Sequence, residues 1–201
     1  MRYKTAFAAA MVLGLGLSLS ACGEDEPADP PAASQTEHNE ADVEFAQSML
    51  PHHAQALAMV DLTRGRQLDP EVQELADAIM AAQTPEIETM TDWLTSWGEE
   101  VPETTRDHMN AEGHGGGHGE MGETSDMPGM MSEEEMSELQ AAGDAEFQAM
   151  WLDMMVEHHQ GAIEMAQTEQ ADGQYQPALD LAEDIENAQA KEVSVMEKLQ
   201  G

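Results

Sequence analysis

Cysteine is almost absent from this sequence, with Cys22 the single one among 201 residues. One thiol cannot close a disulfide within the chain, and it cannot supply the several thiolates of a cysteine-based zinc site. A disulfide-stapled domain and a cysteine-type zinc domain are therefore excluded.

Positive charge is also scarce. The chain has 7 Lys and Arg against 41 Asp and Glu, which gives a formal net charge of −34. A protein that binds nucleic acid needs a basic patch to displace counterions from phosphates, so a nucleic-acid partner is excluded. Aromatic residues make up only 4% of the chain, and high charge with few aromatics is typical of disorder, but the hydrophobic share of 41% argues against disorder throughout.

Methionine is present in unusual excess. The chain has 17 methionines and 8 histidines, whereas methionine ordinarily makes up roughly 2% of a protein. The positions of these methionines and histidines along the predicted helices indicate whether they fill a core or bind a ligand.

The N-terminus reads as an export signal. Arg2 and Lys4 precede an apolar run over residues 6–19, which is too short to span a bilayer and is followed by small residues. The sequence Leu19-Ser20-Ala21-Cys22 resembles a bacterial lipoprotein signal, in which the cysteine is lipidated after cleavage. We expect residues 1–21 to be removed and acyl chains, such as palmitate, on Cys22 to anchor the protein to the outer face of the cell membrane.

Residues 22–39 are rich in Pro, Ala, Asp and Glu and show no apolar period. This composition predicts a flexible acidic tether between the membrane and a domain at 40–201.

An internal repeat organises that domain. The pair His52-His53 recurs as His158-His159, 106 residues later, and at the same offset seven of the sixteen residues in 75–90 are identical to 181–196. Chance would give about one identity. The chain therefore contains two copies of one unit, repeat one at 40–97 and repeat two at 132–201.

Each copy reads as two helices. Apolar residues recur at three- and four-residue steps over 40–66, 70–97, 145–171 and 176–200, and no strand-like alternation is present. Two helical hairpins predict an all-α, four-helix bundle. Pro51 and Pro85 fall inside predicted helices of the first copy, where we expect kinks.

The segment between the copies, residues 98–131, has a different composition. It is rich in Gly, Met and His and is predicted to be a loop or a disordered insert. Its possible metal ligands are His114, His118, Met121, Met127, Met130 and Met131. In an exported protein such a tract could load copper; it could equally be a spacer. Ser132 and Glu135 then fit a capping box at the start of a helix.

The repeat preserves one face of each helix. At 100° per residue, Met49, His52, His53 and Met59 fall within one 120° arc of the first helix. The candidate ligands in the two copies are Met49, His52, His53, Met59, Glu86 and Met90, and Met155, His158, His159, Met165, Glu192 and Met196. Imidazole with thioether favours Cu(I), whereas imidazole with carboxylate would suit iron, manganese, zinc or Cu(II).

A polar cluster without metal is the alternative. Methionines at helical spacing commonly fill cores, and Glu86 could pair with His52 or His53 because a buried carboxylate needs a partner.

The whole pattern resembles the domain-of-unknown-function 305 family. The resemblance rests on the segments FAQSMLPHHAQALAM from Phe45, FQAMWLDMMVEHHQGAIEM from Phe147, Met130-Met131-Ser132, and the matching segments at 83–90 and 189–196. It implies a ferritin-like four-helix fold in exported or lipid-anchored bacterial proteins, some of them linked to copper binding and tolerance.

The leading hypothesis is therefore a lipid-anchored protein that binds copper ions, to sequester them or hand them on at the cell surface. A structural or interaction bundle is the second hypothesis. A ferritin-like oxidoreductase is the third, and it is disfavoured because the paired Glu-x-x-His segments of dinuclear centres are missing. We expect no enzymatic activity, and the protein partner is left open.

Overall fold

The computed structural model describes residues 32–104 and 127–201. These residues form five helices and no strand: α1 (Glu40–Asp61), α2 (Pro70–Trp97), α4 (Glu133–Ala141), α5 (Asp144–Asp172) and α6 (Gln176–Leu199). The all-α class is thus confirmed. The predicted signal at 1–21, Cys22, His114, His118 and Met121 lie outside the described residues.

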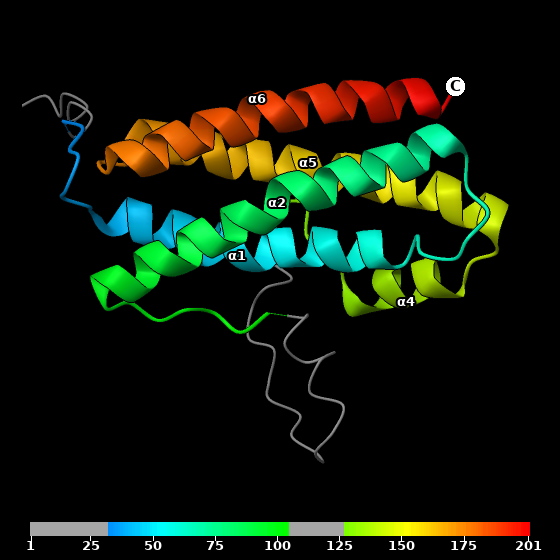
Figure 1. The fold of residues 1–201 in the computed structure, drawn as a ribbon, viewed down its shortest axis with the longest axis horizontal. Helices are drawn as coiled ribbons and strands as arrows, with labels where there is room; N and C mark the ends of the chain where they lie inside the picture. Colours follow the sequence, from blue (N-terminus) through cyan, green and yellow to red (C-terminus); the bar gives the residue numbers. More distant parts are fainter. Residues whose placement is uncertain (1–31, 105–126) are drawn as a thin grey trace, which may run out of the picture.

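The four long helices form two hairpins that lie lengthwise against each other (Figure 1). Helix α1 packs on α2 and α5 packs on α6, while α1 with α5 and α2 with α6 join the hairpins. Each hairpin is one copy of the sequence repeat, so the predicted arrangement of two repeated hairpins is present. The short α4 packs on α5. A specifically ferritin-like arrangement stays a prediction.

Local sequence explains where the helices begin and end. Asn39 accepts a hydrogen bond from the backbone amide of Asp42 and Asp42 accepts one from the amide of Asn39, which caps α1. Ser132 and Glu135 form the predicted capping box before α4. Gly98 caps the C-terminal end of α2, and its φ of 78° is the left-handed conformation that glycine adopts without strain.

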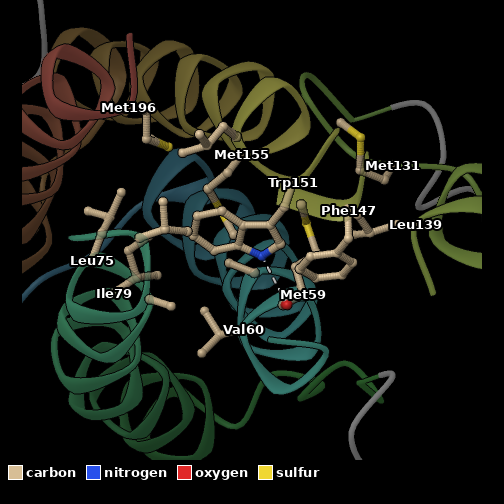
Figure 2. Close-up of a cluster of buried hydrophobic side chains, with 14 residues drawn as sticks. Met59, Val60, Leu75, Ile79, Met131, Leu139, Phe147, Trp151, Met155 and Met196 are labelled. Carbon is tan, nitrogen blue, oxygen red and sulfur yellow. Dashed lines mark hydrogen bonds between the residues drawn. The ribbon is translucent and has the colours of Figure 1, made fainter. Parts of the chain in front are cut away.

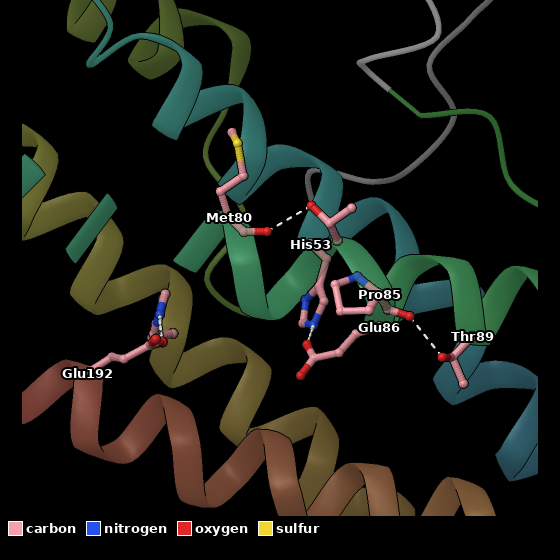
Figure 3. Close-up of polar contacts among 8 residues, drawn as sticks. His53, Met80, Pro85, Glu86, Thr89 and Glu192 are labelled. Carbon is pink, nitrogen blue, oxygen red and sulfur yellow. Dashed lines mark hydrogen bonds and ion pairs between the residues drawn. The ribbon is translucent and has the colours of Figure 1, made fainter. Parts of the chain in front are cut away.

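Helix α1 ends earlier than residue 66, the predicted boundary. Its last helical residue is Asp61, and the backbone then forms tight turns, with the amides of Thr63 and Arg64 bonded three residues back. Gly65, at φ 78°, completes the turn toward α2. By contrast, Pro51 and Pro85 do not interrupt their helices. Near Pro85, side-chain hydroxyls bond helix carbonyls, as where Thr89 donates to the Pro85 carbonyl at 2.8 Å (Figure 3).

The core has two apolar clusters, separated along α1 and α5 by the histidine pairs. The first surrounds Trp151, which is fully buried and donates from Nε1 to the Met59 carbonyl at 3.0 Å (Figure 2). The second lies toward the start of α1 and includes Phe45, Leu50 and Leu94. Each cluster takes side chains from both repeats, so neither hairpin buries its apolar face alone.

Residues 34–39, at the end of the predicted tether, contact the bundle. Ser34 exchanges backbone hydrogen bonds with Gln174 and Gln176 beside the α5–α6 turn, at 2.7 Å each. The ring of His38 stacks on Trp97 with centroids 4.3 Å apart. Over the described ranges, no helix has the length and apolar content needed to cross a membrane.

Candidate metal centre

Four histidines form a buried centre at the middle of the bundle, here called the histidine centre. His52 and His53 lie on α1, His158 and His159 lie on α5, and all four are 0% exposed. Because α1 and α5 pack together, equivalent positions of the two repeats meet. The rings of His52 and His158 have centroids 3.8 Å apart and planes inclined by 37°.

The outer histidine of each copy is bound to the glutamate of the neighbouring helix (Figure 3). His53 Nε2 lies 2.7 Å from Glu86 Oε2, and His159 Nε2 lies 2.8 Å from Glu192 Oε2. Each glutamate is 18% exposed, so its other side faces toward solvent. The repeat is therefore preserved in hydrogen bonding as well as in sequence.

These hydrogen bonds fix which ring nitrogen carries hydrogen. A carboxylate only accepts, so Nε2 of His53 and Nε2 of His159 donate. The Nδ1 atoms of both rings are buried and have no hydrogen-bond partner. A hydrogen on Nδ1 would be a buried donor without an acceptor, at a cost of about 1–3 kcal/mol. Both Nδ1 atoms therefore carry free lone pairs, in the carboxylate–histidine arrangement that orients metal ligands.

The inner histidines differ from each other. His52 Nε2 lies 3.1 Å from the Pro128 carbonyl, which can only accept, so His52 also presents an unprotonated and unpartnered Nδ1. Neither ring nitrogen of His158 makes a well-formed hydrogen bond, and the His52 backbone is the polar group that interacts with this ring. The centre thus contains three oriented Nδ1 lone pairs and one imidazole free to offer either nitrogen.

Burial keeps the inner rings neutral. Desolvation is the main cause that lowers the pKa of His52 to about 3; the repulsion that two protonated neighbouring rings would feel acts in the same direction, and the Pro128 carbonyl opposes the shift. Desolvation and then the three other histidines hold the pKa of His158 well below its ordinary value. Neutral imidazole is the form that binds metal, so protons do not compete for these nitrogens at neutral pH.

A short segment at the end of the insert covers the histidine centre. Residues 127–131, here called the strap, place the Pro128 carbonyl on His52, while the Gln55 amide bonds the Met131 backbone in both directions at 2.7 and 2.8 Å. Gly161 lies under the strap, where a Cβ would approach the Pro128 oxygen to 2.0 Å. A glycine is therefore required at this point of α5 for the strap to seat.

Replacing Gly161 with alanine is expected to displace the strap. The added methyl group overlaps backbone atoms of Pro128 and Gly129, so the strap must move or the protein loses about 1–3 kcal/mol of stability. Hydrogen exchange at residues 129–131 should accelerate. Gly143→Ala is the control, since its Cβ meets nothing within 4 Å. Unchanged exchange and stability in Gly161→Ala would show that the strap is not fixed by this contact.

The repeated methionines lie mainly in the core. Met49, Met59, Met90, Met155 and Met196 are 0% exposed and belong to the two apolar clusters, and Met165 is half-buried against the second. Each copy nevertheless places a methionine one helical turn before its histidines, Met49 before His53 and Met155 before His159. Of the insert methionines, Met131 is buried in the first cluster, Met127 lines a pocket and Met130 is half-buried.

The histidine centre is not a polydentate site of the usual kind. Within residues 32–104 and 127–201, no three His, Cys, Asp or Glu side chains are placed to hold one ion together. The ligands available are neutral imidazoles, with thioethers one turn away. This set fits a soft ion of low coordination number better than a hard, highly charged one.

Several polar groups of this region have little or no signal in the sequence. Only contacts between residues far apart in the sequence bring Gln55, the Pro128 carbonyl and Glu169 to this region. Gln83 and Gln189 stood out as repeat-matched residues, and the structure buries both, leaving both amide atoms of Gln83 and the Gln189 oxygen unpartnered. Recurrence of the same amide in both copies was the one signal that the sequence offered.

Replacing Glu86 and Glu192 with glutamine is expected to weaken metal binding at the histidine centre by about 10–100-fold, the usual effect of losing the group that orients a ligand. Glutamine keeps the size of the side chain but no longer requires Nε2 to be the donor. Competition titration with a copper chelator measures the change. Glu88→Gln and Glu197→Gln, two exposed glutamates of the same helices, serve as controls. Equal affinity in all variants would mean that the glutamates do not act through the histidines.

Comparison with known proteins places this geometry in a family. The model of the domain of unknown function DUF305 matches residues 42–200, which include both hairpins and the histidine centre. The chain belongs to the DUF305 family. No curated protein matches it.

Solved structures of DUF305 proteins share the fold. A protein from Streptomyces coelicolor for which secretion is proposed has 30% identity and a TM-score of 0.65, with 79% of this chain and 91% of that chain covered. A DUF305 fragment from Deinococcus radiodurans has 29% identity and a TM-score of 0.65, covering 86% of this chain and 99% of that one.

A third similar structure holds copper. CopM in the Cu(II)-bound form has 26% identity and a TM-score of 0.61, with 79% of this chain and 95% of that chain covered. CopM has also been solved with Cu(I) and with silver, at 24% identity in each case, which shows the shared fold alone.

Proposed function

We propose that this DUF305 protein binds copper in the histidine centre, to sequester the metal or hand it on at the cell surface. The observation that carries the proposal is the set of three buried Nδ1 lone pairs, on His52, His53 and His159, each oriented by a hydrogen bond at Nε2. A purely structural histidine cluster would be expected to satisfy both nitrogens of each buried ring.

The ligand set favours Cu(I) over harder ions. The nitrogens offered by the histidine centre belong to neutral imidazoles, and two facing imidazoles suffice for a soft ion of low coordination number. The thioethers of Met49 and Met155 lie one turn away and are of the type that Cu(I) accepts. The Cu(II)-bound CopM structure supports copper as the metal, at 26% identity. The proposal concerns binding and transfer, and it involves no catalysed reaction.

Counting bound copper tests this proposal. We expect the chain to retain copper after dialysis against micromolar Cu(I), and to keep the histidine-bound copper when the insert residues 105–126 are replaced by a Gly-Ser linker of equal length. Such a linker preserves the strap but removes His114, His118 and Met121. Loss of all bound copper with the insert would assign binding to the insert. No copper in either protein would favour the structural bundle.

The cellular location is a second part of the proposal. The signal-like residues 1–21 and Cys22 would place the domain outside the membrane on a lipid anchor, consistent with the secretion proposed for the Streptomyces coelicolor relative. Cys22→Ala should move the protein from the detergent phase to the aqueous phase of a detergent partition. Unchanged partition would remove lipidation from the account.

A further inference from the structure

A pocket of about 320 Å³ lies between α1 and α5, next to the histidine centre. It is lined by Ala41, Glu44, Phe45 and Ser48 of α1, by Met165, Thr168, Glu169 and Asp172 of α5, and by Met127 and Pro128 of the strap. Two methionines and three acidic residues therefore line one cavity, and no part of the proposed function uses them.

Glu169 is an unusual residue to find in this cavity. It is 1% exposed, and neither of its carboxyl oxygens receives a hydrogen bond from a protein donor. A buried carboxylate without a donor or counter-ion is strongly unfavourable. The group must therefore hold a proton or meet a cation.

Asp42, the neighbour of Glu169, cannot stabilise the Glu169 carboxylate by donating a hydrogen bond to it. Asp42 is fully buried and accepts three backbone hydrogen bonds, from Asn39, Gln174 and Tyr175. Both carboxyl oxygens of Asp42 are therefore already occupied as acceptors of backbone hydrogen bonds. Burial, then hydrogen bonding to Asp42 and the charges of Asp42 and Asp172, raise the pKa of Glu169 to about 9. In the metal-free protein at neutral pH, Glu169 is a carboxylic acid that donates its proton to Asp42.

We propose that this pocket binds one soft monovalent cation, with the thioethers of Met127 and Met165 as ligands and the Glu169 carboxylate as the compensating charge. Thioethers select soft ions but carry no charge, so a buried cation held by sulfur alone would be uncompensated. Glu169 supplies the missing charge when its proton leaves. The exchange is balanced, since one cation enters and one proton passes to solvent.

The pocket and the histidine centre are neighbouring sites. Pro128 lines the pocket, and its carbonyl bonds His52, so the two sites share one strap residue. Glu44 and Asp172 are exposed at the rim, where they would attract cations from solvent. The pocket is nevertheless a separate site, and it stands whether or not the histidine centre binds copper.

Silver titration distinguishes the two sites. Ag(I) is a soft monovalent ion that needs no reductant, so calorimetry can be run at pH 7 in chloride-free buffers of different ionisation enthalpy, which report the protons released. We expect Met127→Leu/Met165→Leu to bind one Ag(I) fewer than the wild-type chain. The control is Met136→Leu/Met150→Leu, which removes two half-buried methionines outside the pocket and should keep the full stoichiometry.

Proton release identifies the role of Glu169. We expect the wild-type chain to release about one proton more than Glu169→Gln, whose Ag(I) affinity at this site should fall at least tenfold. Glutamine can still donate to Asp42, so this variant should fold, and its thermal midpoint checks that. In His52→Ala/His158→Ala the pocket should keep its silver and its proton release. Full silver binding in the double methionine variant, or equal proton release with and without Glu169, would overturn the proposal.

Discussion

Replacing His52 and His158 together with alanine is expected to weaken copper binding at the bundle by at least about 100-fold, or about 2.7 kcal/mol. The two rings are the closest pair of the histidine centre, with centroids 3.8 Å apart. Losing a group that merely orients a ligand already costs about 10–100-fold, and here two ligands are lost. Competition with a Cu(I) chelator of known affinity measures the change.

Two further variants make this result interpretable. His38→Ala removes a histidine that stacks on Trp97 at the end of α2 and should leave copper affinity unchanged. His52→Asn/His158→Asn keeps polar side chains and more of the buried volume, so it separates loss of ligands from a collapsed cavity. If the asparagine variant folds as the wild type does and binds copper with wild-type affinity, these histidines are not the ligands.

The largest effect on stability is expected from Trp151→Ala, which should lower the free energy of unfolding by about 3–5 kcal/mol. Trp151 is fully buried at the centre of the first apolar cluster (Figure 2) and links α5 to α1 by its bond to the Met59 carbonyl. Alanine leaves a cavity and an unpartnered carbonyl between the two repeats. Urea denaturation followed by circular dichroism measures the loss.

Other tryptophan variants calibrate this prediction. Trp151→Phe keeps most of the apolar contact and loses the hydrogen bond, at a smaller expected cost of about 1–3 kcal/mol. Trp93→Ala removes a half-buried ring at the opposite end and should cost less than Trp151→Ala. A loss under 1 kcal/mol in Trp151→Ala would contradict the view that this cluster joins the two hairpins.

The helices could be predicted from the sequence because their signals are local. The predicted boundaries of 70–97 match α2, since Pro70 opens that helix and Gly98 closes it. The capping box of Ser132 and Glu135 is likewise contained in four residues. The repeat predicted the pairing of hairpins because two copies of one unit, each with one apolar face, bury those faces against each other.

The chemistry of the centre could not be predicted to the same depth. Helical angles put both histidines of a pair on one face, but they do not say which histidine reaches the glutamate. The structure assigns that contact to His53 and His159 and leaves the inner rings to face each other. The strap contacts join Gln55 to Met131 and His52 to Pro128, each 76 residues apart, and no local pattern encodes them.

The roles of the methionines could also be predicted only in part. Its pattern predicted a soft-metal face, yet burial of Met59, Met155 and Met196 in one apolar cluster gives these side chains a packing role as well. Met127 and Met165, by contrast, line the pocket with Glu169, a residue that has no counterpart in the repeated motif.

Anomalous scattering at the copper edge, from crystals of the chain loaded with Cu(I), tests the central claim most directly. The account predicts a peak within bonding distance of Nδ1 atoms of the histidine centre, with His53 and His159 still bonded through Nε2 to Glu86 and Glu192. Copper found only among insert residues, or a histidine centre without a peak in fully loaded crystals, would contradict it.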